Sequence, residues 1–250
     1  MMNDFINALF IFINNPEVSD LNYQIALGLL ENGHDLDYLT VTELADKCFV
    51  STSSLNRFFR IFGYKKYMIF KALFASHMRV RFVQMQNRIA EKKPKQLQEV
   101  LHTCLSEADY QRIIQHDWIE KATSIIHQSN RIVVIGSDEM FSHFSRIQVD
   151  FYVMGKLMIK DSIYKSNFFK PSKDDCVILL SMTGRIVDLN PWLVDQLNQI
   201  NPKIITIGYH AYIEDALSLQ IPDYLDEVLE NMILDHYIQE ITYYYAEKYL

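Results

Sequence analysis

The sequence has few cysteines, no long apolar run and no basic residue near its start. Its three cysteines, Cys48, Cys104 and Cys176, have neither paired nor metal-ligand spacing, so we expect no disulfide framework and no metal site. The apolar run from Phe5 to Ile13 is too short to cross a bilayer, and no Lys or Arg precedes it as in a signal peptide. A cytoplasmic protein is therefore predicted, with the run packing on its own domain or on a partner chain.

Positive charge is missing from most of the chain and concentrated in one segment. Residues 1–39 contain no Lys or Arg, residues 40–93 contain eleven against three acids, and the remainder contains thirteen against twenty-two. The net charge of −7 therefore conceals one strongly basic stretch. Such a distribution is typical of a regulator whose basic segment attracts phosphate backbone while the rest is repelled by it.

The segment 40–74 predicts two short helices joined by a tight turn. Thr40 and Glu43 have the spacing of a capping box, which starts a helix through Lys47. Ser51 can cap a second helix that ends at Gly63. This arrangement is the helix-turn-helix of DNA-binding proteins.

The second helix has one apolar stripe and one polar face. Leu55, Phe58, Phe59 and Phe62 follow a spacing of three and four residues, so they form the stripe. The opposite face is suited to reading base edges or holding phosphates. A solvated amphipathic helix is the alternative, although the turn and both caps favour DNA reading. The predicted DNA contacts are Thr42, Ser51, Thr52, Ser53, Asn56, Arg57, Arg60, Lys65 and Lys66.

The second half of the chain alternates apolar strands with helical patterns. Strands are predicted at 131–136, 175–181 and 203–207, and this alternation indicates a parallel sheet covered on both faces. A charged linker is expected at 91–95. Helices are predicted at 3–14, 22–31, 64–90 (with Met68, Ala72 and Ala75 facing inward), 96–106, 110–128, 138–154, 189–200 and 231–250.

Three of the seven glycines, Gly136, Gly184 and Gly208, follow predicted strands. The carboxyl ends of the strands are where open α/β sheets bind ligands. Ser181 and Thr183 place two hydroxyls beside Gly184, a combination suited to an anionic group. Hydroxyls that only cap the following helix are the alternative.

These residues resemble the RpiR/MurR-type bacterial transcription regulators from about Asn22 to the end. The resemblance depends on ELADKCFVSTSSLNRFFRIFGYKKYMIFK in the first half and on RIVVIG, LSMTGR and IITIG in the second. It implies a multi-domain chain: an all-α helix-turn-helix domain over 1–93, a linker and leading helix over 94–107, and over 108–250 an α/β sugar isomerase (SIS) domain with a mainly parallel sheet flanked by helices.

The resemblance also implies an effector and a way of working. A phosphosugar-like effector would bind near Ser137, Ser181, Thr183 and Gly184, and a homodimer would read double-stranded operator DNA of sugar or amino-sugar metabolism genes without a cofactor or metal. The family has a glycine and a serine where this chain has Asp138 and Met140, and a hydroxyl where it has Ile186, so the effector site looks partly degenerate.

Two alternatives remain. The first is a sugar-phosphate isomerase, for which Asp138, Glu139 and His210 are the acid or base candidates near the predicted loops. Because these candidates are weak and the loops are altered, the sequence predicts that the chain is not an enzyme. The second is a regulator whose SIS domain serves only for dimerisation.

Overall fold

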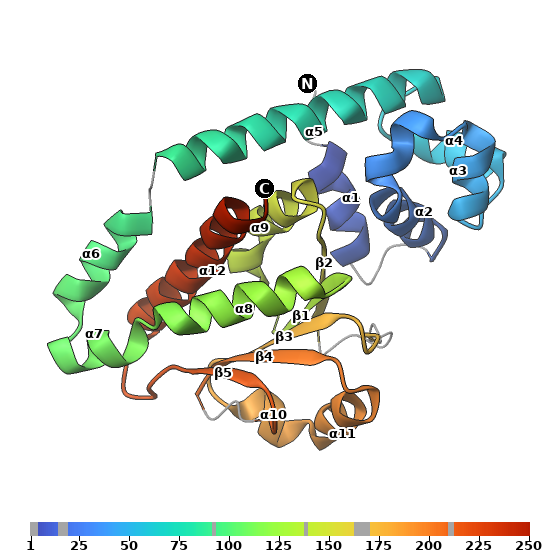
Figure 1. Ribbon diagram of the computed structural model, residues 1–250. Helices are drawn as coiled ribbons and strands as arrows, with labels where there is room; N and C mark the ends of the chain where they lie inside the picture. Colours follow the sequence, from blue (N-terminus) through green and yellow to red (C-terminus); the bar gives the residue numbers. More distant parts are fainter. Residues whose placement is uncertain (1–4, 15–19, 92–93, 138–139, 163–170, 210–212) are drawn as a thin grey trace. The chain divides into compact units, whose positions relative to one another are not determined.

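The protein is described by a computed structural model that covers residues 5–14, 20–91, 94–137, 140–162, 171–209 and 213–250 (Figure 1). Its contacts divide the chain into two compact units, Met1–Met85 and Gln86–Leu250. The division falls within one long helix, upstream of the linker expected at 91–95. Each unit is described by itself.

The first unit is helical and has an aromatic core. Phe5 makes edge-to-face contacts with Phe62 and Phe70 at ring distances of 4.7 and 4.8 Å, and Phe59 stacks on Phe70 at 4.3 Å. Five apolar side chains of the first helix are buried, namely Phe5, Ile6, Leu9, Phe10 and Ile13, whereas Ile11 is exposed. The elements are α1 (Phe5–Asn14), α2 (Asp20–Glu31), the 3-10 helix η1 (Gly33–Tyr38), α3 (Val41–Lys47), α4 (Thr52–Ile61) and α5 (Tyr67–Ala90).

Both predicted caps of the basic segment are confirmed. The Thr40 hydroxyl accepts a hydrogen bond from the Glu43 amide at 3.2 Å, and the Glu43 carboxylate accepts one from the Thr40 amide at 2.8 Å. Ser51 Oγ accepts from the Ser54 amide at 3.1 Å. These bonds satisfy amides that have no partner within the first turn of a helix, which is why α3 and α4 begin where they do.

The second unit contains a five-stranded sheet in which every strand pairs parallel, so the predicted parallel sheet is confirmed. Helices α8, α9 and α12 cover one face, and α10 and α11 cover the other (Figure 1). The strands, in the order β2-β1-β3-β4-β5, are β1 (Arg131–Gly136), β2 (Leu157–Ser162), β3 (Cys176–Ser181), β4 (Lys203–Gly208) and β5 (Leu217–Gln220). The helices are α6 (Pro94–Cys104), α7 (Glu107–Ile113), α8 (His116–Gln128), α9 (Phe141–Val153), α10 (Arg185–Leu189), α11 (Pro191–Ile200) and α12 (Glu227–Tyr249).

Several predicted elements are wrong in detail. The helix predicted over 110–128 is broken after Ile113. At the break, the Tyr237 hydroxyl donates to the Ile113 carbonyl and accepts from the Gln115 amide, so these backbone groups bond to a side chain instead of to the helix. Pro191 starts α11 as a separate helix from α10, since proline fits the first helical position. Met68 and Ala72 are exposed rather than inward-facing.

Two strands were not predicted at all. β2 places Lys160 and Asp161 in a fully buried strand, so its sequence lacks the uniform apolar pattern of its neighbours. β5 has only four residues, and two of them, Ser218 and Gln220, are polar. Both are recognisable as strands only through their pairing with β1 and β4.

Candidate functional site

The turn between α3 and α4 is fixed by backbone hydrogen bonds and by side-chain hydrogen bonds. The Phe49 amide donates to the Asp46 carbonyl and the Val50 amide donates to the Ala45 carbonyl, both at 3.0 Å. These are the two hydrogen bonds of a Schellman cap. From α2, Gln24 Nε2 donates to the carbonyls of Cys48 and Phe49 at 3.1 and 3.3 Å. The turn is therefore held both by the end of α3 and by a neighbouring helix.

Helix α4 separates an apolar side from a polar side as predicted. Leu55, Phe58 and Phe59 are buried, and Phe62 just beyond the helix is half-buried. Of the nine predicted DNA contacts, Asn56 and Thr52 are half-buried, and the others are exposed: Thr42, Ser51, Ser53, Arg57, Arg60, Lys65 and Lys66. All belong to the first unit, between the start of α3 and the start of α5.

Lys71, the next basic residue, has a different place. Its ammonium group donates to the Leu39 carbonyl at 3.2 Å, and the Tyr67 hydroxyl donates to the same carbonyl at 2.9 Å. Burial raises the pKa of Tyr67 to about 12, so its hydroxyl keeps its proton for this bond. Lys71 thus joins α5 to the segment before α3.

Phe49 is a surface residue that no pattern in the sequence singles out. It lies in the turn with a φ of 55° and is 86% exposed. In a Schellman cap this left-handed position is usually glycine. An aromatic residue in a phenylalanine-rich sequence is expected in the core, so only the structure reveals its position.

In the second unit, the predicted effector residues meet where the strand order reverses. The chain passes from β1 outward to β2 and then returns to β3 on the other side of β1. Ligands of open α/β sheets bind at such a reversal, beyond the carboxyl ends of the strands. Ile135 pairs with Leu179 on the adjacent strand, and Ser137 and Ser181 each follow two residues later in the chain.

The hydroxyls at this edge do not have equal access to a ligand. Ser181 is buried and its Oγ accepts from the Ile186 amide at 3.3 Å, which is the capping role. The amide of Gly184, whose φ is 73°, donates to the Ser181 carbonyl at 3.0 Å. Thr183 is exposed and Ser137 is half-buried. Ser137 and Thr183 are therefore the hydroxyls best placed for a ligand.

Gly208 supports the same loop from β4. Its φ is 140°, and a Cβ at this position would lie 2.1 Å from the Ser181 carbonyl oxygen and 2.8 Å from the Met182 amide nitrogen. Only a residue without a side chain allows β4 to approach the end of β3 this closely. The loop that carries Thr183 is therefore packed against the backbone of the next strand.

Lys160 is a buried cation that sequence reasoning missed because β2 was not predicted. It is 7% exposed, and its ammonium group donates to Ser145 Oγ at 2.9 Å and to the Phe141 carbonyl at 3.3 Å. Both acceptors belong to the first turns of α9, the helix that follows the loop after β1. Lys160 thus joins β2 to the first turns of α9.

The remaining observations concern acid or base candidates, metal sites and membrane-spanning helices. Asp138, Glu139 and His210, the acid or base candidates, are outside the described ranges. Within those ranges, no group of His, Cys, Asp or Glu side chains has the arrangement of a metal site. No helix in the described part of the chain is long and apolar enough to span a membrane.

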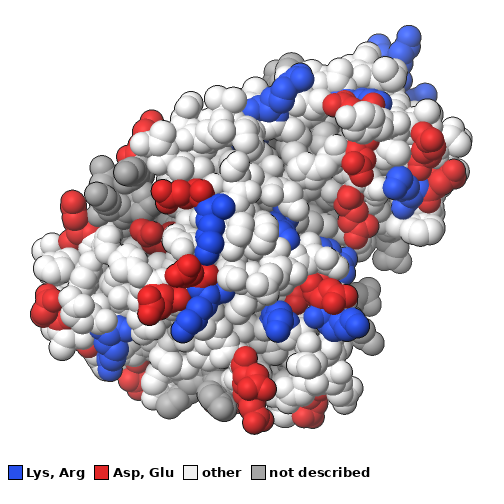
Figure 2. Space-filling view, in the orientation of Figure 1, with Lys and Arg blue, Asp and Glu red and all other residues white. Residues whose placement is uncertain are grey.

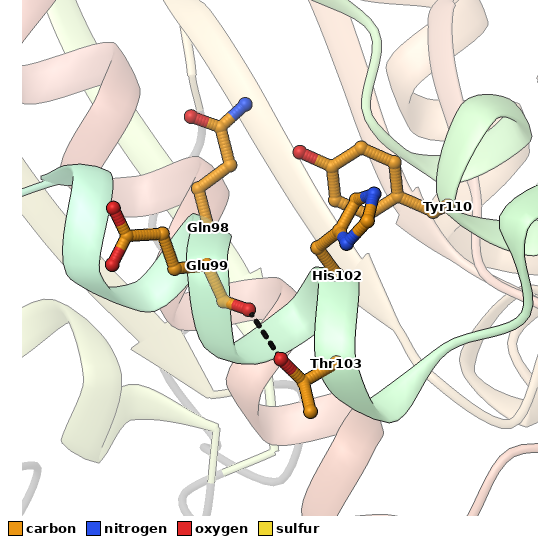
Figure 3. A pocket seen from close by; sticks show the side chains of 5 residues that line it. All are labelled: Gln98, Glu99, His102, Thr103 and Tyr110. Atoms are coloured by element: carbon orange, nitrogen blue, oxygen red, sulfur yellow. Dashed lines mark hydrogen bonds between the residues drawn. The ribbon is translucent and has the colours of Figure 1, made fainter.

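An open pocket of about 500 Å³ lies on α6 and α7 (Figure 3). The His102 ring meets Tyr110 edge-on at 4.6 Å, and the Thr103 hydroxyl donates to the Glu99 carbonyl at 3.0 Å. None of its lining residues, which also include Gln98, belongs to the predicted effector set. On the face of the second unit seen in Figure 2, basic and acidic residues are interspersed.

Comparison with known proteins gives distant structural likenesses only. No protein-family model and no curated protein matches the chain. The Vibrio vulnificus NanR protein complexed with ManNAc-6P is 15% identical over 93% of this chain and 88% of its own, with a TM-score of 0.42. A putative sugar-phosphate isomerase from Listeria monocytogenes is 12% identical over 55% of this chain and 81% of its own, with a TM-score of 0.45.

A third similar structure bears on the enzyme question. It is a hypothetical protein from Methanococcus jannaschii whose structure is described as inferring a 3-hexulose-6-phosphate isomerase function, and it is 14% identical over 64% of this chain and 90% of its own, with a TM-score of 0.43. Two of these three proteins are thus described as sugar-phosphate isomerases. This finding contradicts the prediction from the sequence that the chain is not an enzyme.

Proposed function

We propose that this chain is a cytoplasmic DNA-binding transcriptional regulator of sugar or amino-sugar metabolism genes, controlled by a phosphosugar-like effector. The observation that carries the DNA-binding part is the division of α4: Phe58 and Phe59 are buried, while Arg57 and Arg60 are exposed. Both ends of the α3–α4 turn are fixed by hydrogen bonds, so this polar face is presented by rigid backbone. A rigid helix with exposed guanidinium and hydroxyl groups suits the major groove.

The charge of the surrounding segment supports the same proposal. Lys65 and Lys66 are exposed just beyond α4, where they can meet phosphates flanking the bases that α4 reads. The acidic balance of the residues after 93 opposes contact of the second unit with DNA. The first unit alone therefore carries the proposed interface.

Arg57→Ala tests the reading face. Duplexes selected by the wild-type chain from a random pool would be titrated in a gel-shift assay. We expect Arg57→Ala to weaken binding by about 1–3 kcal/mol, the cost of losing one specific base contact. Arg79→Ala is the matched control, because Arg79 is an exposed arginine of α5 outside the predicted contacts. Equal affinity of the two variants would contradict the assignment of α4.

The effector part of the proposal depends on the edge of the sheet where the strand order reverses. Ser137 and Thr183 would hold an anionic group there, because Thr183 is exposed and Ser137 is half-buried. A ligand that binds only the folded protein at 100 times its Kd stabilises it by about 2.7 kcal/mol. Thermal unfolding in the presence of phosphorylated sugars and amino sugars would detect such binding.

Thr183→Ala is the appropriate variant for this screen, because its hydroxyl is exposed whereas that of Ser181 already caps α10. The stabilisation by the active sugar should be lost in Thr183→Ala and kept in Thr103→Ala, an exposed threonine of the α6 pocket. No response to any sugar would favour a second unit that serves only for dimerisation. Turnover of a sugar in the same samples would favour the isomerase alternative.

The proposed regulator is a homodimer, and α5 supplies a surface that supports this. Ile69, Leu73, Ser76, Val80 and Val83 recur at spacings of four and three residues, and each is exposed or half-exposed. They lie opposite the buried Phe70 and Phe74 side of the helix, and none is charged. This is the repeat by which two copies of one helix pair along a seam.

Sedimentation measurements at several protein concentrations would test the pairing. Val80→Glu should raise the dimer dissociation constant, since it would bury a charge without a partner. Met68→Glu, the same change at an exposed position off the seam, should leave the dissociation constant unaltered. A wild-type monomer, or equal effects of both substitutions, would contradict pairing through α5.

A further inference from the structure

The turn between α3 and α4 stores strain at an exposed aromatic residue. Phe49 has a φ of 55°, which lies in the left-handed region that bulky residues rarely adopt. Its side chain is 86% exposed. The ring therefore contributes little to the core while its backbone position carries a steric cost. Glycine at this position would remove that cost.

The surrounding structure imposes this conformation. The Schellman bonds from Phe49 and Val50 require a left-handed residue at this point. The two bonds from Gln24 hold the carbonyls of Cys48 and Phe49 from α2. The backbone from which the Phe49 ring extends is therefore held in place, and a recognition contact needs such a rigid support.

The location of Phe49 indicates what the ring meets. It lies two residues before Ser51, the N-cap of α4, so it is next to the end of α4 where a reading helix contacts base edges. The polar residues of that end can form hydrogen bonds with bases, whereas the Phe49 ring offers an apolar surface without a hydrogen-bonding group. The 5-methyl group of thymine is the apolar group that the major groove offers, and phenylalanine is one of the side chains that contact it.

We propose that Phe49 is a specificity-determining residue that contacts a thymine methyl group in each half-site of the bound DNA. This inference rests on the proposed DNA-binding function and adds a contact to it. It makes Phe49 a source of preference for thymine in addition to the predicted polar contacts.

The test compares thymine with deoxyuracil, which lacks only the methyl group. Duplexes selected by the wild-type chain would be resynthesised with single thymines replaced by deoxyuracil. At one position in each half-site, wild-type affinity should fall about fourfold, the value of one buried methyl-sized group. The Phe49→Gly variant should bind the unmodified duplex more weakly and show no further loss with deoxyuracil at that position.

Folding provides the second measurement. Phe49→Gly should raise the melting temperature of the first unit while it lowers DNA affinity, so lost binding cannot be attributed to misfolding. Tyr38→Ala is the control, because Tyr38 is 85% exposed in the same unit and lies on η1. It should leave the deoxyuracil response unchanged.

The outcomes separate this inference from the function on which it rests. If the wild-type chain selects no duplex, both fail. If it selects duplexes and Arg57→Ala weakens binding, but deoxyuracil affects wild type and Phe49→Gly equally, only the role of Phe49 is overturned. A change of self-association in Phe49→Gly with unchanged DNA affinity would overturn it as well.

Discussion

The buried histidine of α12 should make the second unit sensitive to mild acid. His236 is 1% exposed, and neither ring nitrogen has a hydrogen-bond partner in the part of the chain that the structure describes. Burial lowers the pKa of His236 from 6.5 to about 4, and the neighbouring His116 adds to the effect. In the unfolded chain the same group would titrate near its ordinary value.

The direction in which stability changes with pH follows from proton binding to His236. Between the two pKa values the unfolded chain binds a proton at His236 and the folded chain does not, so stability falls as pH decreases from 6.5 toward 4. From these values, lowering the pH from 7 to 5 should cost about 2 kcal/mol of the free energy of unfolding. Above pH 7 the histidine contributes almost no pH dependence.

Glu240, one turn further along α12, acts in the opposite direction. Burial raises its pKa, so falling pH relieves the cost of keeping this carboxylate charged. Its contribution is shared by wild type and by variants of His236. The difference between two pH profiles therefore isolates the histidine.

Urea unfolding of wild type and His236→Leu at pH 7, 6 and 5 would measure the effect. Both tryptophans, Trp118 and Trp192, lie in the second unit, so their fluorescence reports its unfolding. We expect His236→Leu to be close to wild type at pH 7 and about 2 kcal/mol less acid-sensitive by pH 5. His34→Gln, a change at an exposed histidine, is the control. Parallel profiles for wild type and His236→Leu would refute the reasoning.

Three further predictions concern stability. Gly208→Ala should prevent normal folding of the second unit, because its Cβ would lie 2.1 Å from a backbone oxygen, whereas Gly63→Ala, with nothing within 4 Å, should cost only about 1 kcal/mol; urea midpoints would compare them. Thr40→Ala removes the capping box of α3 and should cost about 1 kcal/mol, with faster amide hydrogen exchange at the start of that helix. Asp175→Ala removes a fully buried carboxylate that accepts from the Arg131 guanidinium and the Ser172 amide, and should cost about 3 kcal/mol in urea unfolding; a cost below 1 kcal/mol would contradict the assigned bonds.

Local signals in the sequence were sufficient for the elements whose ends are set locally. The caps of α3 and α4 depend on residues three positions apart, and β1, β3 and β4 are mostly apolar because both faces of the sheet are covered. The break after Ile113 could not be predicted, since it depends on Tyr237, far away in the chain. The same holds for β2, whose polar residues are accommodated only by its pairing and by α9.

The candidate site shows a similar division. The polar face of α4 followed from helical spacing alone, and its exposure in the structure agrees with that spacing. The position of Ser137 beside Ser181 required the strand order, which spacing along the chain does not determine. The capping bond of Ser181 required the path of the loop into α10.

Phe49, Lys160 and His236 each depart from a local rule of sequence and structure, and a function would require something different of each. Phe49 carries backbone strain at the surface, Lys160 places a charge in a buried strand, and His236 leaves polar atoms unbonded in the core. A sequence selected for stability alone would replace each of them at little cost. Lys160 is compensated by acceptors on α9, so its role can be structural. The exposed ring of Phe49 has no such compensation, so a contact made by the ring is the proposed reason for the strain, and Phe49 is the most informative residue to change first.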